Sequence, residues 1–140
     1  MVALAGQPVE RETARMTETA LPDLRSRTIL QIIPELSAGG AERTTLEVAE
    51  AIMEAGGRAI VASEGGRLVP ALEALGAEHR TLKLSSKNPA VIISNAGKLA
   101  RLIEETGTDL VHARSRAPAW SALWAARRTG TAFVTTYHGA

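Results

Sequence analysis

From Thr28 onward the sequence alternates short apolar runs with longer amphipathic stretches, and this alternation limits the choice of fold more than any other feature. The apolar runs are rich in Ile, Val and Leu, as is typical of parallel strands that are buried on both faces. Strands that alternate with helices through short connections form right-handed βαβ units. We therefore predict an α/β fold whose parallel sheet has helices on both faces. The expected strands are 29–33, 58–63, 79–84, 110–113 and 132–137, and the expected helices are 41–55, 69–75, 89–105 and 118–129.

The composition is that of a globular chain of one-domain length, because 45% of the 140 residues are apolar. Aromatic residues make up only 3%, so Ala, Leu, Ile and Val must build the core. The absence of cysteine excludes a disulfide scaffold and any zinc or redox site that uses thiolates. A net charge of +1 gives no electrostatic reason to bind a nucleic-acid backbone, and no apolar run is long enough for a membrane span.

The ends of the chain differ from the alternating part. Residues 1–27 show no regular period and contain Pro8 and Pro22, so we interpret them as a mobile N-terminal tail. One domain then covers residues 28–140. The chain stops at Ala140, a few residues after the last expected strand and with no helix to cover that strand. We therefore expect the chain to be the front part of a longer protein.

The stretch 37–43 reads Ser-Ala-Gly-Gly-Ala-Glu-Arg and joins the first expected strand to the first expected helix. Glycine lets a backbone approach a ligand closely, and the free N–H groups of a helix N-terminus attract anions. The pair Gly39 and Gly40 thus predicts a phosphate-bearing ligand, although a tight turn that needs glycine for its geometry alone gives the same pattern. The pattern lacks the Gly-Lys-Ser/Thr of a P-loop and the third glycine of a dinucleotide fingerprint. Glu64 nevertheless lies directly at the end of the second expected strand, after Ser63, where an acid could bind a ribose hydroxyl.

Ligands of such folds bind beyond the carboxyl ends of the strands, which draws attention to the residues after the fourth expected strand. These are His112, Arg114, Ser115 and Arg116. Arginine suits bidentate contacts with phosphate or carboxylate, and Ser115 could bind a hydroxyl-rich ligand or cap the next helix. In the alternative interpretation His112 is a hydrogen-bonded core residue and the arginines face solvent.

The fifth expected strand leads into His138 and Gly139. An imidazole at this edge could donate to a substrate hydroxyl or act as an acid or base, although a lone histidine is more often structural. His79 lies near the start of its strand, on the opposite edge, and we assign it no role. Trp120 and Trp124 share one face of the last expected helix, where we expect them to pack against the sheet or a missing partner. No group of candidate ligands has the spacing of a metal site, so we predict none.

Three motifs, in this order, resemble the N-terminal domain of the family 4 glycosyltransferases, which have the GT-B architecture. They are Ile-Leu-Gln-Ile-Ile-Pro with Gly-Gly-Ala-Glu-Arg, then Val-His-Ala-Arg-Ser, then Thr-Thr-Tyr-His-Gly, and the likeness covers about residues 28–140. The resemblance implies a Rossmann-like, acceptor-side domain of an enzyme that moves a sugar from a nucleotide-sugar donor to a glycan or glycolipid acceptor with retention. It also implies that the C-terminal, donor-side domain is absent from this chain, so that the chain alone should be inactive.

The same resemblance implies roles for individual residues. Gly39 and Gly40 would approach the donor diphosphate across the cleft, and His138 would contact the transferred sugar or the acceptor. The family generally needs no divalent metal and no cofactor besides its nucleotide-sugar substrate. A bacterial, cytoplasmic enzyme of polysaccharide or lipopolysaccharide synthesis is implied, with room for peripheral contact with the inner face of the cell membrane. The acceptor-side residues would be Glu42, His112, Arg114, Ser115 and Gly139.

Two other classes of protein stay open on the residues alone. One is a nucleotide- or NAD-binding domain of an oxidoreductase. The missing third glycine of the dinucleotide fingerprint argues against this class. The other is a non-catalytic α/β interaction module, in which replacing Gly40, Arg114 or His138 would leave activity unchanged.

Overall fold

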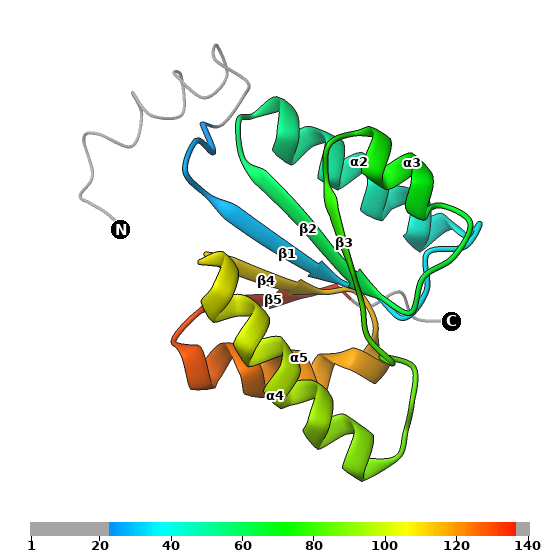
Figure 1. The fold of residues 1–140 in the computed structure, drawn as a ribbon, viewed down its shortest axis with the longest axis vertical. Coiled ribbons are helices and arrows are strands. Elements are labelled where there is room, and N and C mark those ends of the chain that lie inside the picture. The colour runs from blue at the N-terminus through cyan, green and yellow to red at the C-terminus, as the bar shows by residue number, and fades with distance from the viewer. Residues whose placement is uncertain (1–22, 137–140) are drawn as a thin grey trace, which may run out of the picture.

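The structure, a computed structural model, describes residues 23–136 and confirms the α/β prediction. All neighbouring strands of the single five-stranded sheet are parallel, in the order β3-β2-β1-β4-β5. Helices α2 and α3 lie on one face of this sheet, and α4 and α5 lie on the other (Figure 1). The strands are β1 (Thr28–Ile32), β2 (Arg58–Ser63), β3 (Glu78–Thr81), β4 (Leu110–Ala113) and β5 (Ala132–Thr135), and the helices are α2 (Gly40–Glu54), α3 (Val69–Ala74), α4 (Pro89–Thr106) and α5 (Arg116–Thr129).

The core has two parts, one on each face of the sheet. Leu30, Ile32 and Val111 pack against α4 and α5, whereas Ile33 and Val61 pack with residues of α2 and α3. The central strands therefore bury apolar side chains on both faces of the sheet, which explains why their sequences are continuous apolar runs. The buried members of both clusters are Ala, Leu, Ile and Val, as the low aromatic content requires.

Strand β3 is shorter than predicted. Its last residue, Thr81, pairs with Ser63, where its only partner strand β2 ends. The Leu82 N–H still donates to the Ser63 carbonyl at 2.9 Å, but the Leu84 N–H turns back to the Leu82 carbonyl. Leu84 is then buried in the cluster under α4 and α5. Strand β3 stops because its partner strand β2 has ended. The chain also turns there because this buries the Leu84 side chain in the core.

The ends of the helices follow their capping residues. Asn88 Oδ1 accepts from the Ala90 N–H at 2.9 Å and Pro89 takes the first position of α4, as predicted. Helix α5 begins at Arg116, two residues before the predicted start. Pro118 is tolerated inside the first turn because the N–H groups there have no helical acceptor.

The predicted N-terminal tail lies mostly outside the described residues. Within its described part, the Leu24 N–H donates to the Ala55 carbonyl at 3.0 Å, and the Leu24 side chain packs against the α2–α3 cluster. Packed contacts therefore begin before Thr28.

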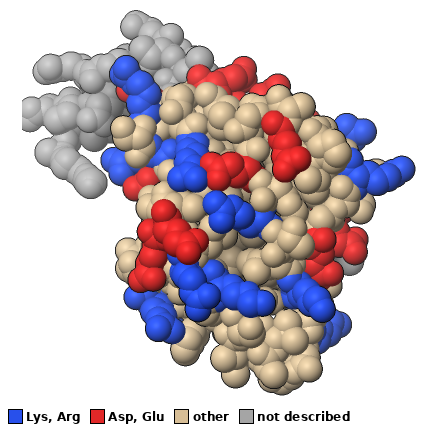
Figure 2. Space-filling view, viewed as in Figure 1, with Lys and Arg blue, Asp and Glu red and all other residues tan. Residues whose placement is uncertain are grey.

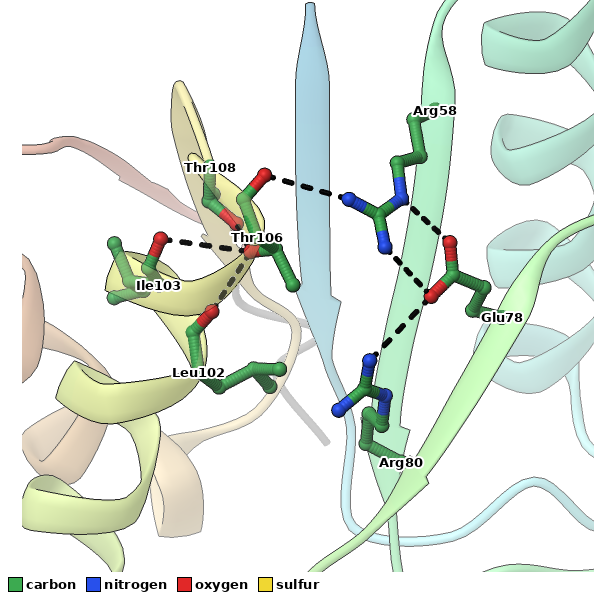
Figure 3. Close-up of polar contacts among 7 residues, drawn as sticks. All are labelled: Arg58, Glu78, Arg80, Leu102, Ile103, Thr106 and Thr108. Carbon is green, nitrogen blue, oxygen red and sulfur yellow. Dashed lines mark hydrogen bonds and ion pairs between the residues drawn. The ribbon is translucent and has the colours of Figure 1, made fainter.

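A polar network ties together the edge of the sheet formed by the amino ends of the strands (Figure 3). Arg58, at the start of β2, donates from Nε and Nη2 to both carboxylate oxygens of Glu78, at 2.5 and 2.9 Å. Arg80 lies 3.5 Å from the same carboxylate, and Arg58 Nη1 reaches the Thr106 carbonyl at the end of α4. The bond from Arg58 holds the pKa of Glu78 below its ordinary value. At this edge charged side chains pair with one another, whereas the opposite edge carries the candidate site.

Candidate functional site

Two interlocked loops form the carboxyl edge of β1 and β2. The loop after β1 is joined to the loop after β2 by backbone bonds from Glu64 N–H to Pro34, from Leu36 N–H to Gly65 and from Leu68 N–H to Leu36, all between 2.8 and 2.9 Å. A Cβ on Gly66, whose φ is +150°, would overlap the carbonyl group of Leu36. The β1–α2 loop is thereby held in place up to the start of α2.

Gly39 and Gly40 lie at this start, and neither has a positive φ. Gly39 is the N-cap of α2, and a Cβ there would overlap the carboxylate of Glu42, whose side chain lies against it. Gly40 is the first residue of α2, and a Cβ there would meet nothing within 4 Å. The backbone geometry of the turn therefore does not require glycine at position 40. Glu42 itself is half-buried in the first turn of α2.

Arg114 is buried, so it does not face solvent as the alternative interpretation of the arginines predicted. The residue follows β4 and is only 5% exposed. Its Nε donates to Gln31 Oε1 at 2.6 Å, and Gln31 Nε2 donates to the Thr45 carbonyl of α2 at 3.2 Å. Burial lowers the pKa of Arg114, and no acidic side chain of residues 23–136 forms an ion pair with it. The side chain is thus a buried cation, held by a neutral amide at the carboxyl edge.

The neighbours of Arg114 have more ordinary surroundings. His112 is half-buried, lies opposite Gln31 in the sheet register, and has its Nε2 3.1 Å from Thr136 Oγ1. Ser115 is the N-cap of α5 but makes no side-chain capping bond, so its hydroxyl does not serve the helix. Arg116 is exposed at the first position of α5. Three of the predicted residues, His112, Arg114 and Ser115, therefore lie together at the end of β4.

Other predicted residues have different outcomes. Glu64 accepts from both the N–H and the hydroxyl of Ser85, which lowers its pKa, so its carboxylate is engaged in holding the loop before α4. His79 Nε2 lies 2.6 Å from Ser63 Oγ, inside the fold. Within residues 23–136 no group of three His, Cys, Asp or Glu could hold a metal ion, and no helix is long and apolar enough to cross a bilayer. His138 and Gly139 lie outside the described residues.

Sequence reasoning missed Gln31, although a signal was present. A glutamine inside the run Ile-Leu-Gln-Ile-Ile is a polar residue in a strand that should be buried on both faces. A buried amide needs hydrogen-bond partners, and the structure supplies Arg114 and the backbone of Thr45. Gln31 therefore connects β1, the residue after β4 and helix α2.

The strand order and the residues at the carboxyl edge define a Rossmann-like α/β domain, and comparison with known proteins places it more narrowly. The profile of Glycosyltransferase Family 4 matches residues 38–140. A glycosyltransferase from Rickettsia africae has a TM-score of 0.75 and 45% identity, over 81% of this chain and 30% of that chain. MurG from Acinetobacter baumannii has a TM-score of 0.65 and 16% identity, over 79% of this chain and 35% of its own. The C-terminal domain of a Pyrococcus furiosus hydrogenase has a TM-score of 0.58 and 18% identity, over 86% and 97%. No curated protein matches the chain.

The chain belongs to glycosyltransferase family 4. The likenesses to MurG and to the hydrogenase domain, both under 25% identity, show the fold alone. The chain spans about a third of the Rickettsia glycosyltransferase and of MurG. Family membership thus confirms the resemblance drawn from the three motifs.

Proposed function

We propose that this chain is the acceptor-side domain of a GT-B enzyme that transfers a sugar, with retention, from a nucleotide-sugar to a glycan or glycolipid acceptor. Family membership supports the reaction class, and the open position at Gly40 is the observation that carries the site assignment. A glycine that neither φ nor packing requires, at the first position of a helix, leaves room for a ligand to approach the backbone.

Gly39 and Gly40 lie at a helix N-terminus whose backbone N–H groups can stabilise the leaving diphosphate. In the transfer, the bond between the anomeric carbon and the diphosphate oxygen breaks, the acceptor hydroxyl oxygen bonds to that carbon, and the hydroxyl proton passes to the leaving diphosphate. Negative charge grows on the diphosphate, and N–H groups aimed at it lower the barrier. The first turn of α2 presents such N–H groups together with the positive end of the helix dipole. A donor-side domain would supply the remaining contacts with the nucleotide.

On the acceptor side, we assign acceptor contacts to Glu42, His112, Arg114, Ser115 and Gly139. We assign His138 to the transferred sugar or the acceptor. Arg114 is a buried guanidinium without an acidic partner among the described residues, which favours an acceptor that carries a phosphate or carboxylate. The Ser115 hydroxyl makes no capping bond, which suits hydrogen bonding to a hydroxyl-rich acceptor. We place the enzyme in the bacterial cytoplasm, in polysaccharide or lipopolysaccharide synthesis.

The proposal is tested with the complete gene product and a panel of nucleotide-sugars offered with lipid-linked and soluble glycan acceptors. We expect transfer from one donor, with the anomeric configuration of the donor kept in the product as seen by NMR. We also expect the 140-residue chain to show no micromolar binding of that donor in calorimetry. An inverted product would contradict retention, and saturable binding of NADH without any sugar transfer would favour the oxidoreductase alternative.

A further inference from the structure

Arg114 is the only Lys, Arg, Asp or Glu that is buried within residues 23–136. In Figure 2 several Lys and Arg at the surface lie beside Asp or Glu. The arginines that form salt bridges in this part of the chain are all exposed, and they are Arg25, Arg27, Arg58 and Arg80. The guanidinium of Arg114 is instead held by a neutral amide, so its positive charge is not offset by any carboxylate of the described residues.

The contact with Gln31 uses one edge of this guanidinium and leaves another. Gln31 Oε1 accepts the Nε–H of Arg114 at 2.6 Å, and the two Nη groups make no hydrogen bond within residues 23–136. No fully enclosed side-chain nitrogen or oxygen in the same residues lacks a hydrogen-bond partner, so the Nη groups are reached from outside the fold. Two parallel N–H bonds on one edge match two oxygens of a phosphate or a carboxylate.

The amide of Gln31 is fixed at its other end by helix α2. Gln31 is fully buried, and its Nε2 donates to the Thr45 carbonyl at 3.2 Å. Thr45 Oγ1 in turn donates at 2.8 Å to the carbonyl of Ala41, in the first turn of α2. Three successive hydrogen bonds therefore join the guanidinium to the turn that follows Gly39 and Gly40. Because both ends of the amide are bonded, the acceptor for Arg114 Nε has one fixed position.

A neutral amide is the side chain that holds this guanidinium without neutralising it. Glutamate at position 31 would accept the same N–H, but its charge would offset that of Arg114. Leucine would leave the charge in place but give Nε no acceptor. A buried cation without a counter-charge is costly for the protein alone. The cost is relieved when an oxyanion from outside supplies the counter-charge.

We propose that Gln31 is a positioning residue, whose neutral amide directs the Nη edge of Arg114 to an oxyanion of the acceptor and keeps the positive charge available for it. Gln31 is fully buried and acts through Arg114 alone. This inference rests on the proposed function and deepens it, because it makes the acceptor a hydroxyl compound that also carries a phosphate or a carboxylate.

The first test measures anion binding by the intact 140-residue chain, in calorimetry at about pH 8, where a carboxyl group next to Arg114 is ionised. Inorganic phosphate is the probe, and acetate is titrated as the carboxylate equivalent. Arg114→Gln defines the binding that does not depend on the guanidinium, such as binding at the glycine turn. We expect Gln31→Glu to weaken the Arg114-dependent binding at least about tenfold, and Gln31→Leu to weaken it less than about fivefold.

Asn88→Asp is the matched control for Gln31→Glu, because it also changes an amide to a carboxylate and alters the net charge equally. Asn88 is exposed, and aspartate caps a helix as well as asparagine does. This variant should bind both anions as the wild type does.

The order of the two Gln31 variants separates charge from structure. Gln31→Leu loses the hydrogen bonds at both ends of the amide, so a merely structural role would make it the weaker binder. The proposal is overturned if Gln31→Leu binds more weakly than Gln31→Glu, or if Gln31→Glu or Arg114→Gln binds both anions as the wild type does. If circular dichroism shows that Gln31→Glu is unfolded, Gln31→Leu decides: affinity between those of the wild type and Arg114→Gln supports the proposal, and affinity equal to either overturns it.

The second test uses the complete gene product and its acceptor. Gln31→Glu should raise the KM for the acceptor at least about tenfold, while kcat and the KM for the sugar donor stay within about twofold of the wild type. An equal rise in the KM for the donor, or an acceptor without an anionic group, would overturn the proposal. If no sugar is transferred at all, the proposed function fails, and the phosphate and acetate titrations still decide whether Gln31 positions Arg114 for an oxyanion.

Discussion

At the scale of single residues, the pair Gln31 and Arg114 holds the candidate site together. A buried guanidinium is costly unless its N–H groups find acceptors, and a buried amide needs partners of its own. Gln31 Oε1 accepts from Arg114 Nε at 2.6 Å, and Gln31 Nε2 donates to the Thr45 carbonyl. The residue after β4 is thereby linked to helix α2 through one side chain.

This pairing predicts a coupling between the two residues. Gln31→Leu leaves Arg114 Nε without its acceptor, and Arg114→Met leaves Gln31 Oε1 without its donor, so each should lower the free energy of unfolding by about 1–3 kcal/mol. The double variant replaces both partners by apolar groups and should lose clearly less than the sum. Urea denaturation of the four proteins measures this, and losses that simply add would show that the pair does not act as a unit.

His79 gives a pH-dependent prediction. Burial lowers its pKa below the ordinary value of 6.5, so the folded state favours the neutral ring that contacts Ser63. The unfolded state then binds more protons just below pH 6.5, and stability that is complete above this pH is lost as the pH falls toward the folded pKa. We expect His79→Gln to lose less stability than the wild type between pH 6.5 and pH 5. Parallel curves for the two proteins in chemical denaturation would contradict this role for His79.

The burial and the contacts of individual side chains could not be predicted from the sequence. The motif identified Arg114 as important, but its burial depends on Gln31, which lies 83 residues away along the chain. Trp120 and Trp124 are 72% and 59% exposed and do not pack against the sheet, and this likewise depends on how α5 rotates against α4. Such outcomes are decided by contacts between distant segments, whereas periodicity reports only which face of one element is apolar.

At the scale of the elements, the β1–α2 loop is held by the loop after β2. Gly66→Ala combines an unfavourable φ of +150° with overlap against the Leu36 backbone, and we expect a loss of more than about 2 kcal/mol in unfolding free energy. Gly65→Ala is the matched control, because its φ is +105° but its Cβ meets nothing within 4 Å. Its loss should stay near the ~1 kcal/mol of backbone strain alone. Equal losses for the two variants would mean that contact with Leu36 contributes nothing.

The order and type of the described elements were predictable because each strand and helix has a clear pattern and a stop signal. Asn88 and Pro89 mark the start of α4, and Gly107, with a φ of 65°, ends it. The ends of β3 and α5 were not predictable in the same way. The length of β3 depends on where β2 ends, and the start of α5 depends on the tolerance of its first turn for Pro118.

At the scale of the whole molecule, the two edges of the sheet differ in the residues that they carry. At the amino edge, Arg58 forms a salt bridge with Glu78, and their side chains are 44% and 36% exposed. The carboxyl edge carries the open glycine and the buried arginine. Glu78→Gln should therefore reduce the unfolding free energy by at most about 1 kcal/mol and leave transfer activity unchanged. Thermal unfolding measures the change in stability, and a donor-turnover assay on the same preparation measures activity. A loss of turnover would show that the amino edge contributes to function, which would contradict this prediction.

In the proposed enzyme, position 40 is a glycine because a ligand, and not the fold, requires it. Gly97, inside α4, also has no positive φ, and a Cβ there would likewise meet nothing within 4 Å, so Gly97→Ala is a matched control. Both Gly40→Ala and Gly97→Ala should keep stability or raise it by up to about 1 kcal/mol, since neither alanine is strained. In the complete gene product, kcat/KM for the sugar donor should fall at least about tenfold in Gly40→Ala, equivalent to ~1.4 kcal/mol, and stay unchanged in Gly97→Ala. Full activity in a stable Gly40→Ala protein would contradict the ligand requirement at this position.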